Sequence, residues 1–270
     1  MKRKKVLSLL LVCLLAVGVQ AARVDTVMVK SPSMNKDVKV VFVVSDKALA
    51  KQNCPVLFLL HGYGGNATNW IKKKPELKQI VDEKGWIVVC PDGNDSWYWD
   101  SPKDPSFKYE TFVAKELVAY TDSHYATIAD KKARAITGLS MGGHGALWLA
   151  TRHKDVFGAV GCMSGGVDIR PFPLNWKMKE RLGEYVANKA SWDAHTVMTA
   201  VEGLVNGDLA ITIDCGSSDF FYEVNKSLHN KLLARKIDHD FVVRPGGHTW
   251  SYWVSSLDFQ VVFFDRFFKK

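Results

Sequence analysis

The stretch ITGLSMGGHGALWLA (residues 136–150) places one serine between two glycines, with an apolar run before it and a helix-like run after it. A strand that delivers Ser140 into a sharp turn before a helix would expose the serine hydroxyl. Close packing of this turn against its neighbours would leave no room for a Cβ atom at Gly138 or Gly142. Because a serine hydroxyl is a weak nucleophile by itself, the turn carries chemistry only if a base and an acid lie nearby.

Short apolar runs, each ending in a turn rich in Gly, Asp, Ser or His, recur along the chain. They occupy residues 55–62, 85–93, 133–140, 157–165, 209–219 and 240–248. Continuous apolar runs of this length predict parallel strands that are buried on both faces. Two earlier segments, residues 26–29 and 38–44, are rich in β-branched residues and predict an antiparallel pair at the edge of the sheet.

Amphipathic segments between and after these runs predict helices. Apolar side chains recur at helical spacing in residues 113–120, 221–232 and 253–264. Strands that alternate with helices predict an α/β fold, with a mostly parallel central sheet and helices on both faces. In such sheets the functional groups collect at the carboxyl ends of the strands.

The first 21 residues predict a secretory signal peptide. Basic residues at positions 2–5 precede an apolar run, which ends in the sequence Val-Gln-Ala at positions 19–21. The apolar run is shorter than the roughly 20 residues that a membrane-spanning helix requires. We therefore expect an exported protein, periplasmic or secreted, with no stable membrane insertion after the signal is cleaved.

The remaining residues, 22–270, are expected to form a single domain. They contain no linker-like tract and no internal repeat, and one α/β domain of this size is common. Loss of the four basic residues of the signal would lower the formal net charge from +8 to +4. No cluster of Lys and Arg with interleaved aromatic residues follows, so nucleic acid is not an expected partner.

Four cysteines remain after the signal: Cys54, Cys90, Cys162 and Cys215. Three of them lie in or at the end of strand-like runs, where cysteine is commonly a small buried hydrophobe. Free buried thiols are therefore expected, and Cys162 with Cys215 is the favoured pair if a disulfide forms. No paired Cys/His spacing indicates a metal site, and we expect neither a metal nor another cofactor.

A base and an acid for Ser140 follow it in the chain. In an α/β-hydrolase the order is serine, acid, histidine, each on a turn after a later strand. Asp219 comes directly after one strand-like run, and His248 lies in the glycine turn RPGGHTW after the last run. The rival acid, Asp214, lies inside its run and is expected to point into the sheet. His144, one turn beyond the serine, is expected to be a packing or rim residue.

Two backbone N–H groups are expected to form an oxyanion hole, which stabilises the negative charge on a reacting carbonyl oxygen. One is the amide of Met141, at the start of the predicted helix, where free N–H groups favour an anion. The other is the amide of Tyr63, in the glycine-rich loop FLLHGYGGN, with His61 as a loop-stabilising residue. Trp97 and Tyr98, in a polar loop, are expected to line the substrate pocket.

Several motifs together resemble one known family. They are LLHGYGGNATNW, PDGNDSWYWDSP, YETFVAKEL, RAITGLSMGGHGALWLA, MSGGVDI, DCGSSDFFYEVNKSLHNKL and RPGGHTWSYW. In this order they are similar to the "Putative esterase" family of α/β-hydrolases, which includes tributyrin esterases, feruloyl esterase domains and S-formylglutathione hydrolases. The resemblance extends from about residue 38 to the C-terminus. It implies Ser140 as nucleophile, Asp219 as acid, His248 as base, and the amides of Tyr63 and Met141 as the oxyanion hole.

The prediction is an exported serine esterase that hydrolyses carboxylic esters through an acyl-enzyme on Ser140. Its substrates would be short-chain acyl esters or acetyl and feruloyl esters linked to carbohydrate, either small molecules or attached to a glycan. A thioester hydrolase of the S-formylglutathione hydrolase type is the first alternative, although an export signal disfavours that cytosolic role. The second is a catalytically silent α/β-hydrolase scaffold that binds glycans at the cell envelope. The segment of residues 165–208, a long connection between two strands, is expected to overhang the serine and to select the substrate.

Overall fold

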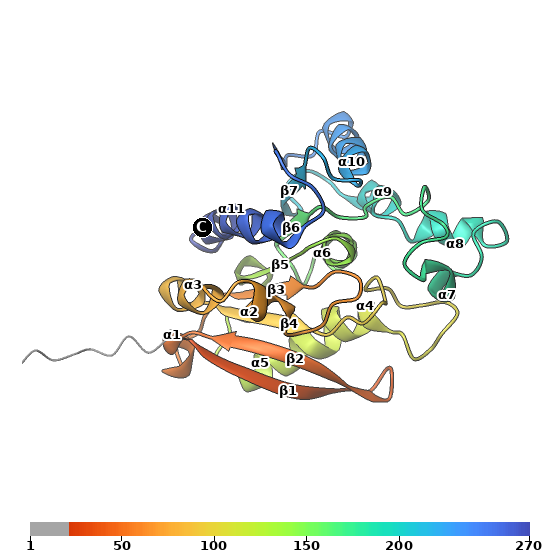
Figure 1. Cartoon of the computed structure of the whole chain (residues 1–270). Coiled ribbons are helices and arrows are strands. Elements are labelled where there is room, and N and C mark those ends of the chain that lie inside the picture. The colour runs from red at the N-terminus through yellow and green to blue at the C-terminus, as the bar shows by residue number, and fades with distance from the viewer. Residues whose placement is uncertain (1–21) are drawn as a thin grey trace, which may run out of the picture.

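An eight-stranded sheet runs through the structure, a computed structural model that describes residues 22–270 (Figure 1). The signal peptide predicted at residues 1–21 lies outside the described residues. The strands are β1 (Arg23–Ser31), β2 (Lys36–Val44), β3 (Val56–Leu60), β4 (Ile87–Pro91), β5 (Arg134–Gly138), β6 (Ala159–Met163), β7 (Ala210–Gly216) and β8 (Asp240–Arg244). Each predicted apolar run contains one of the last six strands.

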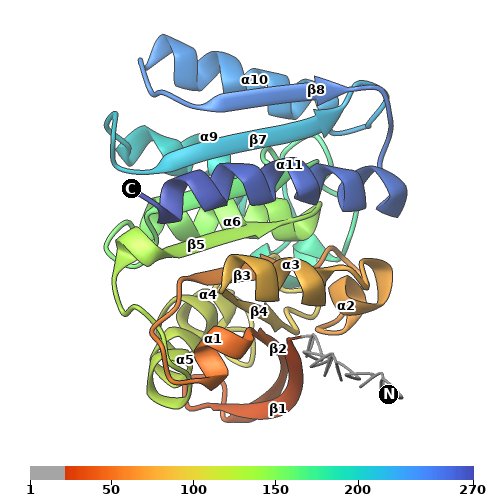
Figure 2. The same ribbon diagram turned by 90° about the vertical axis from the view of Figure 1, so that its left-hand side faces the viewer.

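The strands lie in the order β1-β2-β4-β3-β5-β6-β7-β8 across the sheet. In Figure 2, β1 lies at one edge of the sheet and β8 at the other. Strands β1 and β2 pair antiparallel, and β2 pairs antiparallel with β4, whereas all the pairs among β3 to β8 are parallel. The predicted edge pair and the predicted, mostly parallel α/β sheet are both confirmed.

The helices cover both faces of the sheet. They are α1 (Asp46–Leu49), α2 (Asn69–Lys73), α3 (Leu77–Lys84), α4 (Tyr109–Thr111), α5 (Leu117–His124), α6 (Met141–Arg152), α7 (Met178–Leu182), α8 (Lys189–Ala194), α9 (Val197–Ala200), α10 (Tyr222–Ala234) and α11 (Trp250–Phe268). A π-helical turn, η1 (Phe112–Glu116), joins α4 to α5, and short 3-10 turns, η2 (Lys131–Ala133) and η3 (Val201–Gly203), precede β5 and follow α9. None of the helices within residues 22–270 combines the length and the apolar character that a membrane span needs.

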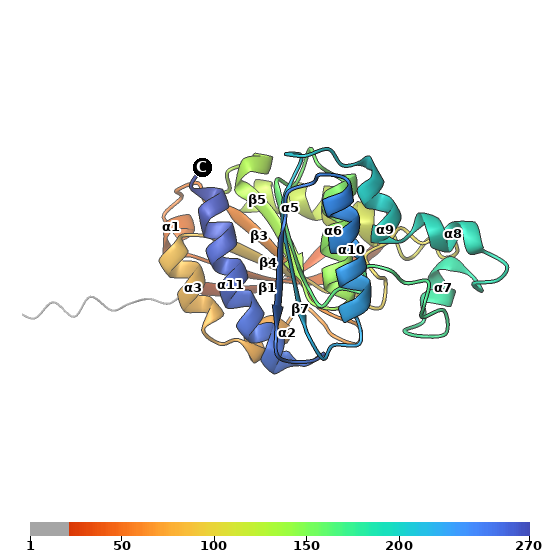
Figure 3. The same cartoon turned by 90° about the horizontal axis from the view of Figure 1, so that it is seen from above.

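Two hydrophobic clusters form, one on each face of the sheet. Helices α3 and α11 lie on one face, and α6 and α10 lie on the other (Figure 3). Leu257 and Phe264 of α11 are fully buried in the first cluster, and Leu228 and Leu232 of α10 in the second. The apolar stripes seen in the sequence therefore face the sheet, and each fully buried Leu or Phe contributes roughly 1.5–3 kcal/mol through the hydrophobic effect.

All four cysteines of the described chain are free and buried, as the sequence predicts. The bridge between Cys162 and Cys215 is absent. Burial raises the pKa of the Cys90 and Cys162 thiols to about 12. At neutral pH these groups are protonated, so they behave as small apolar side chains rather than as nucleophiles.

Candidate active site

Ser140 lies at the apex of the sharp turn between β5 and α6. Its φ of 55° and ψ of −118° place a non-glycine residue in a region that costs about 1–3 kcal/mol. A Cβ atom on Gly138 would lie 2.6 Å from the backbone of Gly142, and one on Gly142 would lie 2.6 Å from the carbonyl oxygen of His61. The expectation that both glycines leave no room for a side chain is confirmed. Close packing holds the strained serine in place.

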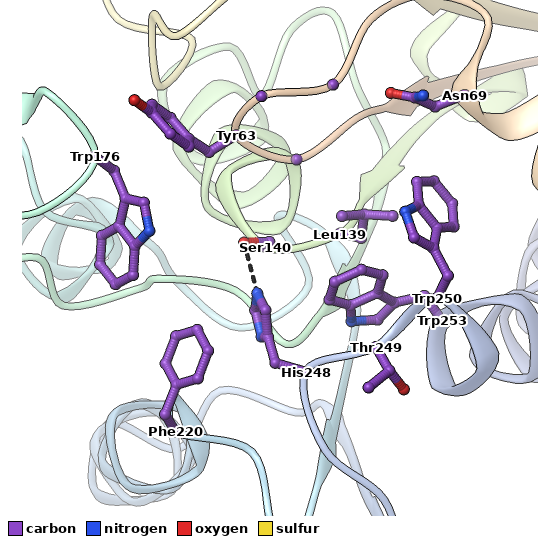
Figure 4. Close-up of a pocket in the computed structure, with 13 residues that line it drawn as sticks. Tyr63, Asn69, Leu139, Ser140, Trp176, Phe220, His248, Thr249, Trp250 and Trp253 are labelled. Carbon is purple, nitrogen blue, oxygen red and sulfur yellow. Dashed lines mark hydrogen bonds between the residues drawn. The ribbon is translucent and has the colours of Figure 1, made fainter.

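Ser140, His248 and Asp219 form one chain of hydrogen bonds (Figure 4 shows the first link). The distance from His248 Nε2 to Ser140 Oγ is 2.9 Å, and His248 Nδ1 lies 2.9 and 3.1 Å from the two carboxylate oxygens of Asp219. A carboxylate only accepts hydrogen bonds, so Nδ1 carries the proton and Nε2 is free to accept one from the serine. The three residues that the sequence selected are thus in contact in series.

Two adjacent loops carry the acid and the base. The N–H of Ser217 donates to the carbonyl of Arg244 at 2.9 Å, and the N–H of Ser218 donates to the carbonyl of Gly246 at 2.9 Å. The Asp219 side chain is buried, and its Oδ1 also accepts the N–H of Phe221 at 2.8 Å. The parallel pairing of β7 with β8 therefore continues into the loops and fixes the acid relative to the base.

Aromatic rings hold the imidazole of His248. The ring of Phe220 lies 4.2 Å away, centroid to centroid, and the ring of Trp253 lies 4.7 Å away and nearly perpendicular. The imidazole side chain is only 16% exposed. These contacts limit rotation of the ring, so its Nε2 atom stays directed at Ser140.

The glycine-rich loop after β3 lies against the serine. A Cβ atom on Gly62 would lie 3.2 Å from Cβ of Ser140. His61 joins this loop to the one after β4: its Nδ1 donates to the carbonyl of Gly62 and its Nε2 accepts the N–H of Gly93, both at 2.7 Å. His61 thus has the loop-stabilising role expected of it. Tyr63 lines the same pocket as Ser140, and Met141 begins helix α6.

A pocket of about 510 Å³ opens over the serine and the histidine. Its aromatic walls are Tyr63, Trp176, Phe220, Trp250 and Trp253, and Asn69 and Thr249 supply polar groups. Figure 4 shows Tyr63, Trp176 and Phe220 on one side of Ser140, and Trp250, Trp253 and Asn69 on the other. The segment of residues 165–208, which was expected to overhang the serine, contributes Trp176 to the wall of this pocket.

The expectation that Trp97 and Tyr98 line the pocket is corrected by the structure. Both are fully buried, with exposures of 1% and 0%. Their φ angles of 56° and 60° turn the chain so that both side chains point into the protein. Trp97 stacks on Trp99, and Tyr98 donates its hydroxyl hydrogen to the carbonyl of His61 at 3.1 Å. They support the site from behind and cannot contact a substrate.

The structure also shows the positions of His144 and Asp214, the two other residues that the sequence analysis considered for the site. His144 is buried, and its Nδ1 lies 3.0 Å from the carbonyl oxygen of Gly166. Burial lowers the pKa of His144 to about 3, so the ring is a neutral packing group. Asp214 is buried and bonded to Arg244 and to the start of α11, not to His248. Asp219 is therefore the carboxylate that contacts the base.

The fold and the site define an α/β-hydrolase, and comparison with known proteins gives its family. The chain belongs to the Esterase family, whose description is "Putative esterase" and whose model matches residues 31–264. Two named relatives are an acetyl esterase from Caldicellulosiruptor saccharolyticus and an S-formylglutathione hydrolase from Bos taurus. The acetyl esterase is 25% identical over 219 residues, covering 77% of this chain and 82% of that protein.

The S-formylglutathione hydrolase is 25% identical over 228 residues, covering 75% of this chain and 79% of that protein. A solved structure of a ferulic acid esterase is similar to this chain with a TM-score of 0.80 and 28% identity, covering 92% of this chain and 99% of that one. Membership of this family makes the chain a hydrolase of the esterase class. The family that the sequence motifs resemble and the predicted α/β-hydrolase fold are both confirmed.

The packing around Gly142 predicts the effect of adding one methyl group. We expect Gly142→Ala to lower the free energy of unfolding by about 1–3 kcal/mol, because the new Cβ overlaps backbone atoms that cannot move aside. Ester turnover should fall about a hundredfold as Ser140 shifts. Gly203→Ala is the matched control, since no atom lies within 4 Å of its added Cβ. Urea denaturation and p-nitrophenyl acetate turnover measure both effects, and equal values for the two variants would contradict the packing argument.

Proposed function

We propose that this chain is an exported serine esterase that hydrolyses carboxylic esters through an acyl-enzyme on Ser140. The observation that carries the proposal is the series of contacts from Ser140 through His248 to Asp219, at the floor of a pocket open to solvent. A serine next to a neutral imidazole, itself oriented by a buried carboxylate, is an activated nucleophile. The three groups occupy the carboxyl ends of three strands in one sheet.

The reaction follows from this proton path. Ser140 Oγ attacks the ester carbonyl carbon while His248 Nε2 takes the hydroxyl proton, and Asp219 stabilises the imidazolium that forms. As the tetrahedral intermediate collapses, the carbon–oxygen bond to the alcohol breaks and His248 returns the proton to the leaving alcohol. His248 then takes a proton from water, the hydroxide attacks the acyl-enzyme, and the acid leaves as Ser140 regains its proton.

The carbonyl oxygen becomes negative in both tetrahedral intermediates. In the proposal it receives hydrogen bonds from the backbone N–H groups of Tyr63 and Met141. Gly62, next to Tyr63, lies so near the serine that an added Cβ atom would be 3.2 Å from Ser140 Cβ, and the N-terminus of α6 favours negative charge through its free N–H groups. The amide of Met141 is fixed in advance by the buried start of α6, so it needs no rearrangement when the charge appears.

Replacing the nucleophile tests the mechanism. We expect Ser140→Ala to lower turnover of p-nitrophenyl acetate on the order of a million-fold, because the triad acts as a unit, with no loss of stability. Ser227→Ala, on the exposed face of α10, is the control and should keep full turnover. A fluorophosphonate probe should label the wild type and the control but not Ser140→Ala. Wild-type turnover in Ser140→Ala would exclude this mechanism, and a wild type that neither turns over esters nor reacts with the probe would favour a silent scaffold.

The proposed substrates are short-chain acyl esters and acetyl or feruloyl esters linked to carbohydrate. The aromatic walls of the pocket suit a flat acyl group or the apolar face of a sugar, and Asn69 and Thr249 offer hydrogen bonds. The names of similar proteins, an acetyl esterase and a ferulic acid esterase, support this class. The similarity to an S-formylglutathione hydrolase keeps a thioester as the second candidate.

Parallel assays distinguish these substrates. We expect kcat/KM for ethyl ferulate, acetylated xylan or p-nitrophenyl acetate to exceed the value for S-formylglutathione by at least about tenfold, a difference of about 1.4 kcal/mol in transition-state binding. Trp176→Ala should lower kcat/KM for ethyl ferulate more than for p-nitrophenyl acetate, since only the larger acyl group reaches that wall. Leu174→Ala is the matched control, because its side chain is 85% exposed and does not line the pocket. A higher kcat/KM for S-formylglutathione than for all three esters would contradict the proposed substrate class and favour a thioester hydrolase.

Export is proposed from the basic and apolar character of residues 1–21. The first strand, β1, begins at Arg23, two residues after the proposed cleavage point, so removal of the signal would leave the sheet intact. N-terminal sequencing of the protein from the periplasm or the medium should give Ala22 as its first residue. Recovery of the full-length chain from the cytoplasm alone would contradict export without affecting the proposed chemistry.

A further inference from the structure

Asp214 is a buried carboxylate that the proposed reaction does not use. It lies near the carboxyl end of β7, and only 1% of its surface is exposed. Burying an ionised carboxylate is costly unless hydrogen bonds and a cation compensate for the lost water. The hydrogen-bond partners of Asp214 provide this compensation.

Three side chains donate to Asp214. Arg244 Nη2 lies 2.7 Å from one carboxylate oxygen, and the hydroxyls of Tyr252 and Ser256 lie 2.6 and 2.9 Å from the other. Arg244 Nη2 also donates to the hydroxyl of Ser256 at 2.7 Å. Both oxygens are thus occupied, one by β8 and the other by α11.

These partners stand at the two ends of the loop that carries His248. Arg244 is the last residue of β8, four residues before the histidine, and Tyr252 lies in the first turn of α11, four residues after it. The loop between them begins with Pro245, whose φ is fixed, but continues with Gly246, at a φ of 145°, and Gly247, and these two glycines give the backbone just before His248 conformational freedom. One carboxylate therefore fixes both anchor points of a short, glycine-containing loop.

Tyr252 also packs on the loop itself. A Cβ atom on Gly246 would collide with the Tyr252 ring. Burial and the hydrogen bond to Asp214 raise the pKa of Tyr252, so its hydroxyl is a hydrogen-bond donor at neutral pH. Asp214 holds the hydroxyl, and the ring in turn holds the backbone two residues before His248.

We propose that Asp214 is a positioning residue, which holds the loop of residues 245–249 so that His248 Nε2 meets Ser140. The inference rests on the proposed function, because positioning matters only if His248 is the base. Displacements of about 1 Å can cost on the order of a hundredfold in rate. Asp214 contacts neither Ser140 nor His248, so it acts through Arg244 and Tyr252.

The substitution Asp214→Asn tests this role with little change in volume. The amide keeps an oxygen for Tyr252 and Ser256, but it turns an N–H group toward Arg244, which has only donors. We expect kcat for p-nitrophenyl acetate to fall about ten- to a hundredfold, with KM within about twofold of the wild type. In a His248→Ala background, Asp214→Asn should cause no further loss of the residual turnover, because its effect passes through the missing imidazole.

Asp122→Asn is the matched control. Asp122 pairs with the buried Arg134 at 2.7 Å, at the opposite end of β5 from Ser140. We expect it to lower the midpoint of urea unfolding while leaving kcat within about twofold. An equal loss of kcat in both variants, or a further loss in the His248→Ala background, would show that Asp214 contributes only general stability and would overturn the proposal.

Further variants distinguish an error in the positioning role of Asp214 from an error in the proposed function. If Asp214→Asn does not fold, Tyr252→Phe removes one hydroxyl, leaves the Arg244 pair intact and is expected to lower kcat in the same direction. If Ser140→Ala is inactive while folded Asp214→Asn or Tyr252→Phe keeps wild-type kcat, the positioning role is wrong and the proposed function stands. If Ser140→Ala remains active, the proposed function itself is wrong.

Discussion

The close approach of two backbones at Gly142 is the constraint on which the site depends. The first turn of α6 lies so near the end of β3 that a Cβ atom would meet the carbonyl oxygens of Leu60 and His61. This contact brings the glycine-rich loop beside Ser140 and forces the serine into its strained turn. The nucleophile and the loop that carries Tyr63 are therefore placed by one packing contact, whose cost the surrounding core offsets.

The second half of the site depends on pairing rather than on close packing. Strands β7 and β8 run parallel, and the hydrogen bonds of Ser217 and Ser218 extend their register into the loops that carry Asp219 and His248. Because β8 is the edge strand, it has a strand neighbour on one side only. On its other side, the last residue of β8, Arg244, donates hydrogen bonds to Ser255 and Ser256 of α11. These bonds fix the end of β8 in the absence of a second neighbouring strand.

Much of the fold and of the triad could be predicted from the sequence, because both depend on local patterns. Apolar runs mark the parallel strands, and the order of Ser140, Asp219 and His248 follows the turns after three of them. The pocket walls could not be predicted in this way. Trp97 and Tyr98 turn inward because two successive non-glycine residues adopt positive φ, which their side chains do not favour. Trp176 reaches the pocket from a long connection whose path is set by tertiary packing, not by periodicity.

The four thiols have a consequence for where the protein can fold. Cys90, Cys162 and Cys215 lie in strands and Cys54 lies just before β3; all four are buried, and none is bonded to another in the part of the chain that the structure describes. The folded state of residues 22–270 is thus held together without a covalent crosslink, by packing and hydrogen bonds alone. Reaching this tertiary structure therefore does not require a disulfide to form among these four cysteines.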